Sequence, residues 1–131
     1  MTKEKDWIDE YLQELLKYQH MLKRVPETNK VQRIEILSKQ LVFIGKLAGE
    51  FSERYKKIYA SRKRMHAEAY LAATKNKAAV AELAIMDLRE EEAKAYGDMK
   101  RWNNAFESTR EEINAIKYKV RIDIADGSSR G

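Results

Sequence analysis

Cysteine is absent from this chain of 131 residues, and proline occurs only once, at Pro26. Without cysteine the chain can form no disulfide, no thiolate metal site and no cysteine nucleophile. A chain without disulfides fits the reducing cytoplasm, which is the location that we expect. The single proline and five glycines leave few positions at which a helix has to stop.

Long apolar runs are missing too. The stretch LVFIGKLAG (41–49) is interrupted by Lys46, whereas a helix that crosses a bilayer needs about 20 predominantly apolar residues. The N-terminal MTKEKDWIDEY also lacks the apolar core of a signal peptide. We therefore expect a soluble, intracellular protein with no membrane partner.

Helix-forming residues dominate what is present. Charged residues make up 36% of the chain and aromatic residues 9%. Alanine, leucine, glutamate, lysine and arginine are abundant and favour helices, while β-branched alternation is scarce. The composition predicts an all-α fold, and the length fits one domain. The 26 basic and 21 acidic residues leave a net charge of +5, which favours acidic partners.

The first helix is predicted over about 6–24. Apolar residues recur there at helical spacing, and Asp6 can cap the first turn. Pro26 disfavours helical geometry in the residue before it, so the helix should end shortly before the proline. Thr28 or Asn29 can cap the helix that follows. The apolar face comprises Trp7, Ile8, Tyr11, Leu12, Leu15, Leu16, Tyr18 and Leu22.

A seven-residue repeat predicts two longer helices, over about 28–74 and 78–122. In both segments two of every seven positions are mostly apolar, which is the pattern of a coiled-coil seam. ATKNKA (73–78) has the weakest helical signal and is a predicted turn. The first seam comprises Ile34, Leu41, Ala48, Tyr55, Arg62 and Ala69 with Leu37, Ile44, Phe51, Ile58, Met65 and Ala72. The second seam comprises Leu88, Ala95, Trp102, Thr109 and Ile116 with Ile85, Glu92, Met99, Phe106, Ile113 and Val120.

These elements predict a long antiparallel helical hairpin, coiled-coil-like, with an additional N-terminal helix. We expect one helical domain over 1–125 and a flexible tail at 126–131. A two-helix hairpin buries little apolar surface, although packing supplies most of the stability of helices in proteins. We therefore expect the hairpin to self-associate into an oligomer with a thicker core.

The basic stretch ERYKKIYASRKRMH (53–66) holds six lysine or arginine residues and one glutamate, and so carries a charge of +5. The rest of the chain is therefore close to neutral. A charge run on a long helix is usually a solvated face. If the turn lies near 75–76, Arg62 lies opposite residues near 90, where Glu92 is the acidic residue of the seam. Such an ion pair would fix the register of the two helices.

That ion pair leaves most of the positive charge unexplained. Lys56 and Lys63 are seven residues apart, as are Lys57 and Arg64, so the four cations share one stripe two turns long, with Tyr59 between them. Cations can follow a phosphate backbone, and an interleaved ring can stack on an unpaired base, which favours single-stranded nucleic acid. The candidate nucleic-acid-binding residues are Arg54, Lys56, Lys57, Tyr59, Arg62, Lys63 and Arg64.

Other chemistry has little support in the sequence. His20 and His66 are far apart and lack carboxylates at metal-ligand spacing. The sequence contains no glycine-rich phosphate loop, and its serines have no base at a defining spacing. We therefore expect no enzymatic activity, no metal and no cofactor.

The segment KAYGDMKRWNNAFESTREEINAIKYKVRI (94–122) resembles the C-terminal helix of the T4-type phage recombination mediators, the UvsY family. In that family a segment with tyrosine and tryptophan precedes a pattern of the form xxxIxAIKxxxxxI. YKKIYASRKR (55–64) is similar to the basic segment of the same family. The residues that correspond to the first pattern here are Ile113, Ala115, Ile116 and Lys117, with Ile122 one position earlier than the last isoleucine of the pattern.

The resemblance implies a particular role. Mediators of this kind bind single-stranded DNA as ring-like oligomers. They help to load a RecA-type recombinase onto DNA coated by a single-strand-binding protein, without hydrolysing ATP. A phage-encoded protein of this kind would act in the cytoplasm of the host cell. The matched basic positions, which would contact DNA, are Lys56, Lys57, Arg62, Lys63 and Arg64. The residues that would carry oligomerisation in the C-terminal helix are Trp102, Phe106, Ile113 and Ile116.

Two alternatives fit the same sequence. The chain could be a phage coiled-coil module for protein–protein interaction, such as an adaptor, a scaffold or an inhibitor of a host protein, with no nucleic-acid role. It could also bind RNA, because phosphate and stacking contacts serve RNA and DNA alike.

Overall fold

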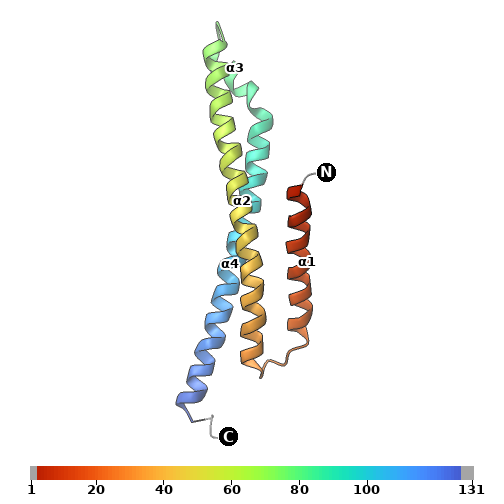
Figure 1. Cartoon of the computed structure of the whole chain (residues 1–131). Helices are drawn as coiled ribbons and strands as arrows, with labels where there is room; N and C mark the ends of the chain where they lie inside the picture. Colours follow the sequence, from red (N-terminus) through yellow and green to blue (C-terminus); the bar gives the residue numbers. More distant parts are fainter. Residues whose placement is uncertain (1–2, 128–131) are drawn as a thin grey trace. The chain divides into compact units, whose positions relative to one another are not determined.

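The computed structural model describes residues 3–127 of the chain (Figure 1). Within that range the residues form four helices and no strand. The prediction of an all-α fold is therefore confirmed. Two of the helices are long, and both contain the predicted seven-residue repeat. The helices are α1 (Lys3–Lys23), α2 (Lys30–Ala72), α3 (Lys77–Ala84) and α4 (Met86–Ala125).

Three helix ends differ from the predicted ones. Helix α1 begins at Lys3, so Asp6 lies inside the helix and the predicted cap is wrong. The single helix predicted over 78–122 is two helices, because a break at Ile85 separates α3 from α4. No glycine or proline marks this break in the sequence. Helix α4 ends at Ala125, and most of the predicted flexible tail, 128–131, lies outside the described residues.

Two side chains at the start of α2 order the loop between α1 and α2. The backbone N–H of Gln32 donates to Asn29 Oδ1 over 3.2 Å, so Asn29 caps α2 as predicted. The Arg33 guanidinium donates to the backbone carbonyls of Leu22, at 3.5 Å, and Val25, at 3.2 Å. These bonds tie the loop to α2, and the Leu22 carbonyl also accepts the backbone N–H of Val25 over 3.1 Å.

The chain forms two compact units, one from 1–47 with 103–131 and one from 48–102. In the first unit, α1 and the last part of α4 both pack against the beginning of α2 (Figure 1). Tyr11 contacts Phe43 with ring centroids 5.6 Å apart. The buried apolar core of this unit comprises Leu15, Val25, Ile36, Leu37, Ile44, Leu47 and Ile113.

In the second unit, the rest of α2 pairs with α3 and the beginning of α4. Phe51 stacks on Trp102 with ring centroids 6.2 Å apart, and Tyr55 contacts Tyr96. Because higher residue numbers on α2 meet lower numbers on α4, the two helices run antiparallel here, which fits the predicted hairpin. The turn predicted at 73–78 is confirmed. Its last residue before α3, Asn76, adopts a left-handed conformation with φ 52°, which asparagine tolerates better than most residues.

The predicted seams face inward. Every seam position of α4 is buried or half-buried, and so is every seam position of α2 except Met65 and Ala72. Ala81 of α3 and Ile85, at the break that follows α3, are fully buried. The seven-residue repeat therefore identified which face of each long helix packs inside the chain.

Candidate nucleic-acid interface

The basic stretch lies in α2 and falls wholly within the second unit. Lys56, Lys57, Lys63 and Arg64 are all exposed, as the stripe pattern predicted. Among the described residues, Lys56 and Arg64 form no ion pair. Lys57 Nζ lies 3.1 Å from Glu53 Oε1, with the two side chains 72% and 61% exposed. An ion pair that exposed contributes little free energy, so Lys57 can exchange its partner for a phosphate.

Arg62 has a different role from the other cations. Its Nε donates to Glu92 Oε1 over 2.5 Å, and its Nη2 lies 3.5 Å from Oε2, with each side chain only 15% exposed. The ion pair predicted from the register is therefore confirmed. Its charge is balanced inside the hairpin, so Arg62 adds little to a phosphate-binding surface.

Arg54 is held along α2. Its Nε donates to Glu50 Oε2 over 3.2 Å, and its guanidinium carbon lies 5.2 Å from the centre of the Phe51 ring. Both contacts are with residues about one turn or less away on the same helix. Arg54 is thus placed beside the exposed stripe, with a local partner for its charge.

Tyr59 lies beside the stripe with 37% of its surface exposed. Lys63 Nζ lies 5.0 Å from the centre of the Tyr59 ring, and the guanidinium carbon of Arg62 lies 5.3 Å from it. Such cation–π contacts stabilise a cation at the face of an aromatic ring. The predicted interleaving of rings and cations is therefore present at this position.

Sequence reasoning missed two residues of α4 that extend this cluster. The rings of Tyr59 and Tyr55 are 6.2 Å apart, and the rings of Tyr55 and Tyr96 are 5.4 Å apart in an edge-to-face arrangement. Lys100 Nζ lies 6.0 Å from the centre of the Tyr96 ring. The sequence contains a signal for this extension, because Tyr96 and Lys100 are one turn apart on α4. The register set by Arg62 and Glu92 also places Tyr96 near residue 58 of α2.

Two of the four residues expected to carry oligomerisation, Trp102 and Phe106, contact α2 within the chain. Trp102 stacks on Phe51, and Ile113 is 5% exposed. A Cβ atom built on Gly45 would lie 3.2 Å from Phe106 Cε2, so the Phe106 ring packs closely on that glycine. Ile116 is half-buried. Trp102 and Phe106 therefore have packing partners within the chain.

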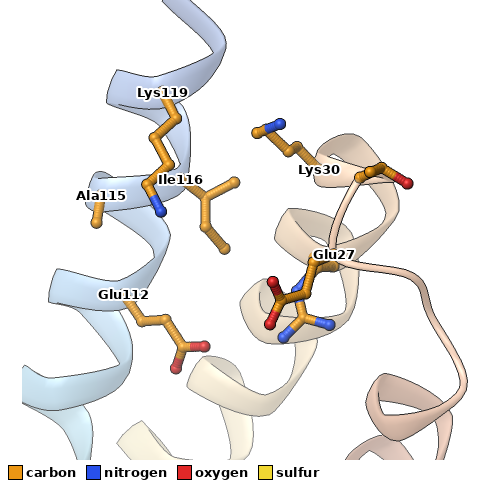
Figure 2. Close-up of a pocket in the computed structure, with 8 residues that line it drawn as sticks. Glu27, Lys30, Glu112, Ala115, Ile116 and Lys119 are labelled. Atoms are coloured by element: carbon orange, nitrogen blue, oxygen red, sulfur yellow. The ribbon is translucent and has the colours of Figure 1, made fainter.

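A hollow of about 450 Å³ lies in the first unit, between the start of α2 and the end of α4 (Figure 2). Glu112 and Lys119 of α4 face it from one side, and Glu27 and Lys30 face it from the other. Lys30 Nζ also lies 3.5 Å from Asp123 Oδ2. The charges around the hollow are mixed, and Arg33 is committed to the loop carbonyls, so the hollow does not favour one class of ligand.

Among the described residues there is neither a cluster of side chains placed to bind a metal ion nor a helix that could span a membrane. Residues 3–127 contain no group of three or more acidic, histidine or cysteine side chains placed to hold a metal ion. His66 Nε2 instead lies 3.1 Å from Glu82 Oε2, and Arg89 also contacts the Glu82 carboxylate. None of the described helices is long and apolar enough to cross a membrane.

Comparison with protein-family models, with curated proteins and with solved structures found no match to this chain.

Proposed function

We propose that this protein binds single-stranded nucleic acid, with DNA as its ligand, through a stripe on α2 formed by Lys56, Lys57, Lys63 and Arg64. The observation that supports the proposal is that all four cations are exposed, while Arg62 of the same stretch is paired with a glutamate inside the hairpin. Within this short stretch, one cation forms an ion pair inside the hairpin and four cations face the solvent. A backbone of phosphates is the common ligand for such a surface.

The stripe is short. The stripe from Lys56 to Arg64 spans about 12 Å of helix, so one copy reaches only a few phosphates. Linking several copies would raise the effective concentration of the second and later contacts. We therefore include self-association of the chain in the proposed function.

An apolar surface in the first unit supports that self-association. Val31 of α2 is 62% exposed and Ile124 of α4 is 60% exposed. Both lie beside Val120 at hollows between the start of α2 and the end of α4, and Ile34 also lines one of them. Exposed apolar side chains that gather in one place favour contact with another protein surface.

The biological role that we propose is recombination mediation. The support is the resemblance of 94–122 and 55–64 to the phage mediators, together with the exposed cations of α2. In this role the protein would act in the host cytoplasm, would need no nucleotide, and would help a RecA-type recombinase to displace a single-strand-binding protein from DNA.

The first experiment is fluorescence anisotropy of a labelled oligo(dT), titrated with the protein at about 50 and about 300 mM salt. Tight binding at low salt that weakens steeply at high salt is the expected result, because bound cations release counterions from the strand. An absence of binding at low salt would overturn the proposal. A matched oligo(U) titration would separate a preference for DNA from one for RNA.

A second candidate function is a protein–protein interaction module without nucleic-acid binding. The observation that favours it is that three large apolar side chains of the second unit are exposed: Leu71 by 78%, Leu83 by 68% and Met86 by 57%. Formation of a stoichiometric complex with one protein, with no affinity for oligo(dT), would favour this module over the mediator.

A further inference from the structure

We propose that three tyrosines of the second unit, Tyr59, Tyr55 and Tyr96, form a track on which the bases of a single strand stack. The track leads from α2 across to α4, so the strand would cross the hairpin. This inference rests on the proposed function, because it assigns the path of the bases to a protein whose phosphate contacts lie on α2. The residue pair that it adds to the interface is Tyr96 with Lys100.

The three rings are continuous. Tyr59 and Tyr55, one turn apart on α2, have centroids separated by 6.2 Å, and the Tyr55 and Tyr96 rings are separated by 5.4 Å. The two outer rings are the open ones: Tyr59 is 37% and Tyr96 is 46% exposed, while Tyr55 between them is half-buried. Tyr55 therefore supports the outer rings, and Tyr59 and Tyr96 are the two that can accept a base.

A lysine side chain lies over each outer ring. Lys63 lies over Tyr59 at 5.0 Å, and Lys100 lies over Tyr96 at 6.0 Å. Among the described residues neither lysine forms an ion pair. An aromatic surface with a cation beside it is the combination that proteins use for single strands, since the ring takes the base and the cation takes the phosphate. The repetition of the same pair on two helices is what indicates a path rather than one isolated contact.

Binding would exchange partners without rearranging the helices. In the structure each lysine covers part of a ring face, and such a cation–π interaction is weak at an exposed site. A base that stacks on the ring would displace the ammonium group, and the long flexible lysine side chain can then reach the adjacent phosphate. The same exchange, of an ammonium group for a base on the ring, would take place at both tyrosines.

The test compares oligo(dT) with an abasic oligonucleotide of the same length, which keeps the phosphates and removes the bases. The wild-type protein should bind oligo(dT) at least about five-fold more tightly than the abasic strand, the lower end of what one base stacked on an aromatic ring contributes. Replacing Tyr96 by leucine should lower that preference without abolishing it, because Tyr59 can still accept a base, and should leave the salt dependence of binding unchanged. Lys100→Ala should instead reduce the salt dependence.

Tyr118→Leu is the matched control, because Tyr118 is an exposed tyrosine of α4 that belongs to the first unit. It should leave binding to both strands unchanged. Equal binding of oligo(dT) and the abasic strand by the wild-type protein, or a Tyr96→Leu variant that keeps the full preference, would overturn the track while the phosphate stripe still stood. Failure of the wild-type protein to bind either strand would instead overturn the proposed function itself. Circular dichroism of Tyr96→Leu, expected to match the wild type, excludes unfolding as the cause.

Discussion

Arg62 and Glu92, thirty residues apart in the sequence, meet inside the hairpin of the second unit through two nitrogen–oxygen contacts of 2.5 and 3.5 Å. Each side chain is 15% exposed. A charged pair in that position is compatible with one alignment of α2 and α4, because a shift by one turn would leave both charges half-buried without partners. The pair therefore specifies the register of the hairpin more than it stabilises the fold.

The first prediction concerns this pair. Replacing Glu92 alone by leucine should lower the free energy of unfolding by about 2 kcal/mol, because the Arg62 guanidinium then stays poorly solvated and unpaired. Replacing both residues by leucine should restore most of the loss, since apolar side chains suit the seam. Urea unfolding followed by circular dichroism measures both changes. Equal stability of the single variant and the wild type would show that solvent already satisfies Arg62.

The second prediction concerns the exposed stripe on α2. Changing its four cations to alanine should weaken binding to oligo(dT). It should also reduce the slope of log affinity against log salt by about 0.7 for each phosphate that the variant no longer binds. Helicity should stay the same, because alanine is a strong helix former. The four residues are Lys56, Lys57, Lys63 and Arg64.

A control with the same change in net charge tests whether position matters. Four exposed cations of the first unit can be changed to alanine instead, and DNA affinity should then fall much less than in the stripe variant. An equal loss of affinity in both variants would mean that net charge alone attracts the strand. The control residues are Lys17, Lys23, Arg24 and Lys39.

The third prediction uses two glycines of α2. A Cβ at Gly49 would meet no atom within 4 Å, so Gly49→Ala should stabilise the protein by about 0.5–1 kcal/mol through the lower entropy of the unfolded chain. At Gly45 the same Cβ would lie 3.2 Å from the Phe106 ring. Gly45→Ala should therefore gain less than Gly49→Ala or lose stability. Thermal unfolding of the two variants gives the comparison, and a larger gain at Gly45 would mean that Phe106 moves aside easily.

The fourth prediction separates packing inside the chain from contacts between copies. Ile113 is 5% exposed, so Ile113→Asp should unfold the first unit, with a large loss of helicity and thermal stability. Ile124 is 60% exposed, so Ile124→Asp should keep the helicity and lower the mass of the particle in solution. Circular dichroism measures the helicity, and light scattering measures the mass of the particle. A folded Ile113→Asp variant with reduced mass would return oligomerisation to the seam of α4.

Much of the fold follows from heptad counting. The repeat correctly placed Ile113 and Phe51 on inward faces, and a turn near 75–76 was enough to pair Arg62 with Glu92. The break at Ile85 could not be predicted, because the sequence around it contains strong helix formers and the buried position of Ile85 depends on tertiary packing.

The candidate site was only partly predictable for a related reason. Exposure of Lys56 and Lys63 follows from helical periodicity within α2 alone. The contact of Tyr55 with Tyr96 joins two helices, and its recognition needs the register to within about one turn. The division of the cations into paired Arg62 and exposed Lys63 likewise depends on what faces them across the hairpin.

The division into units affects the order in which the protein can fold during synthesis. Residues 48–102 are contiguous, so the second unit has all of its partners as soon as residue 102 has left the ribosome. The first unit joins 1–47 to the segment that follows residue 102 and has to wait for that segment, which also makes its contacts more distant in sequence and slower to form. A nascent chain would thus complete the proposed strand-binding surface before the proposed surface for self-association.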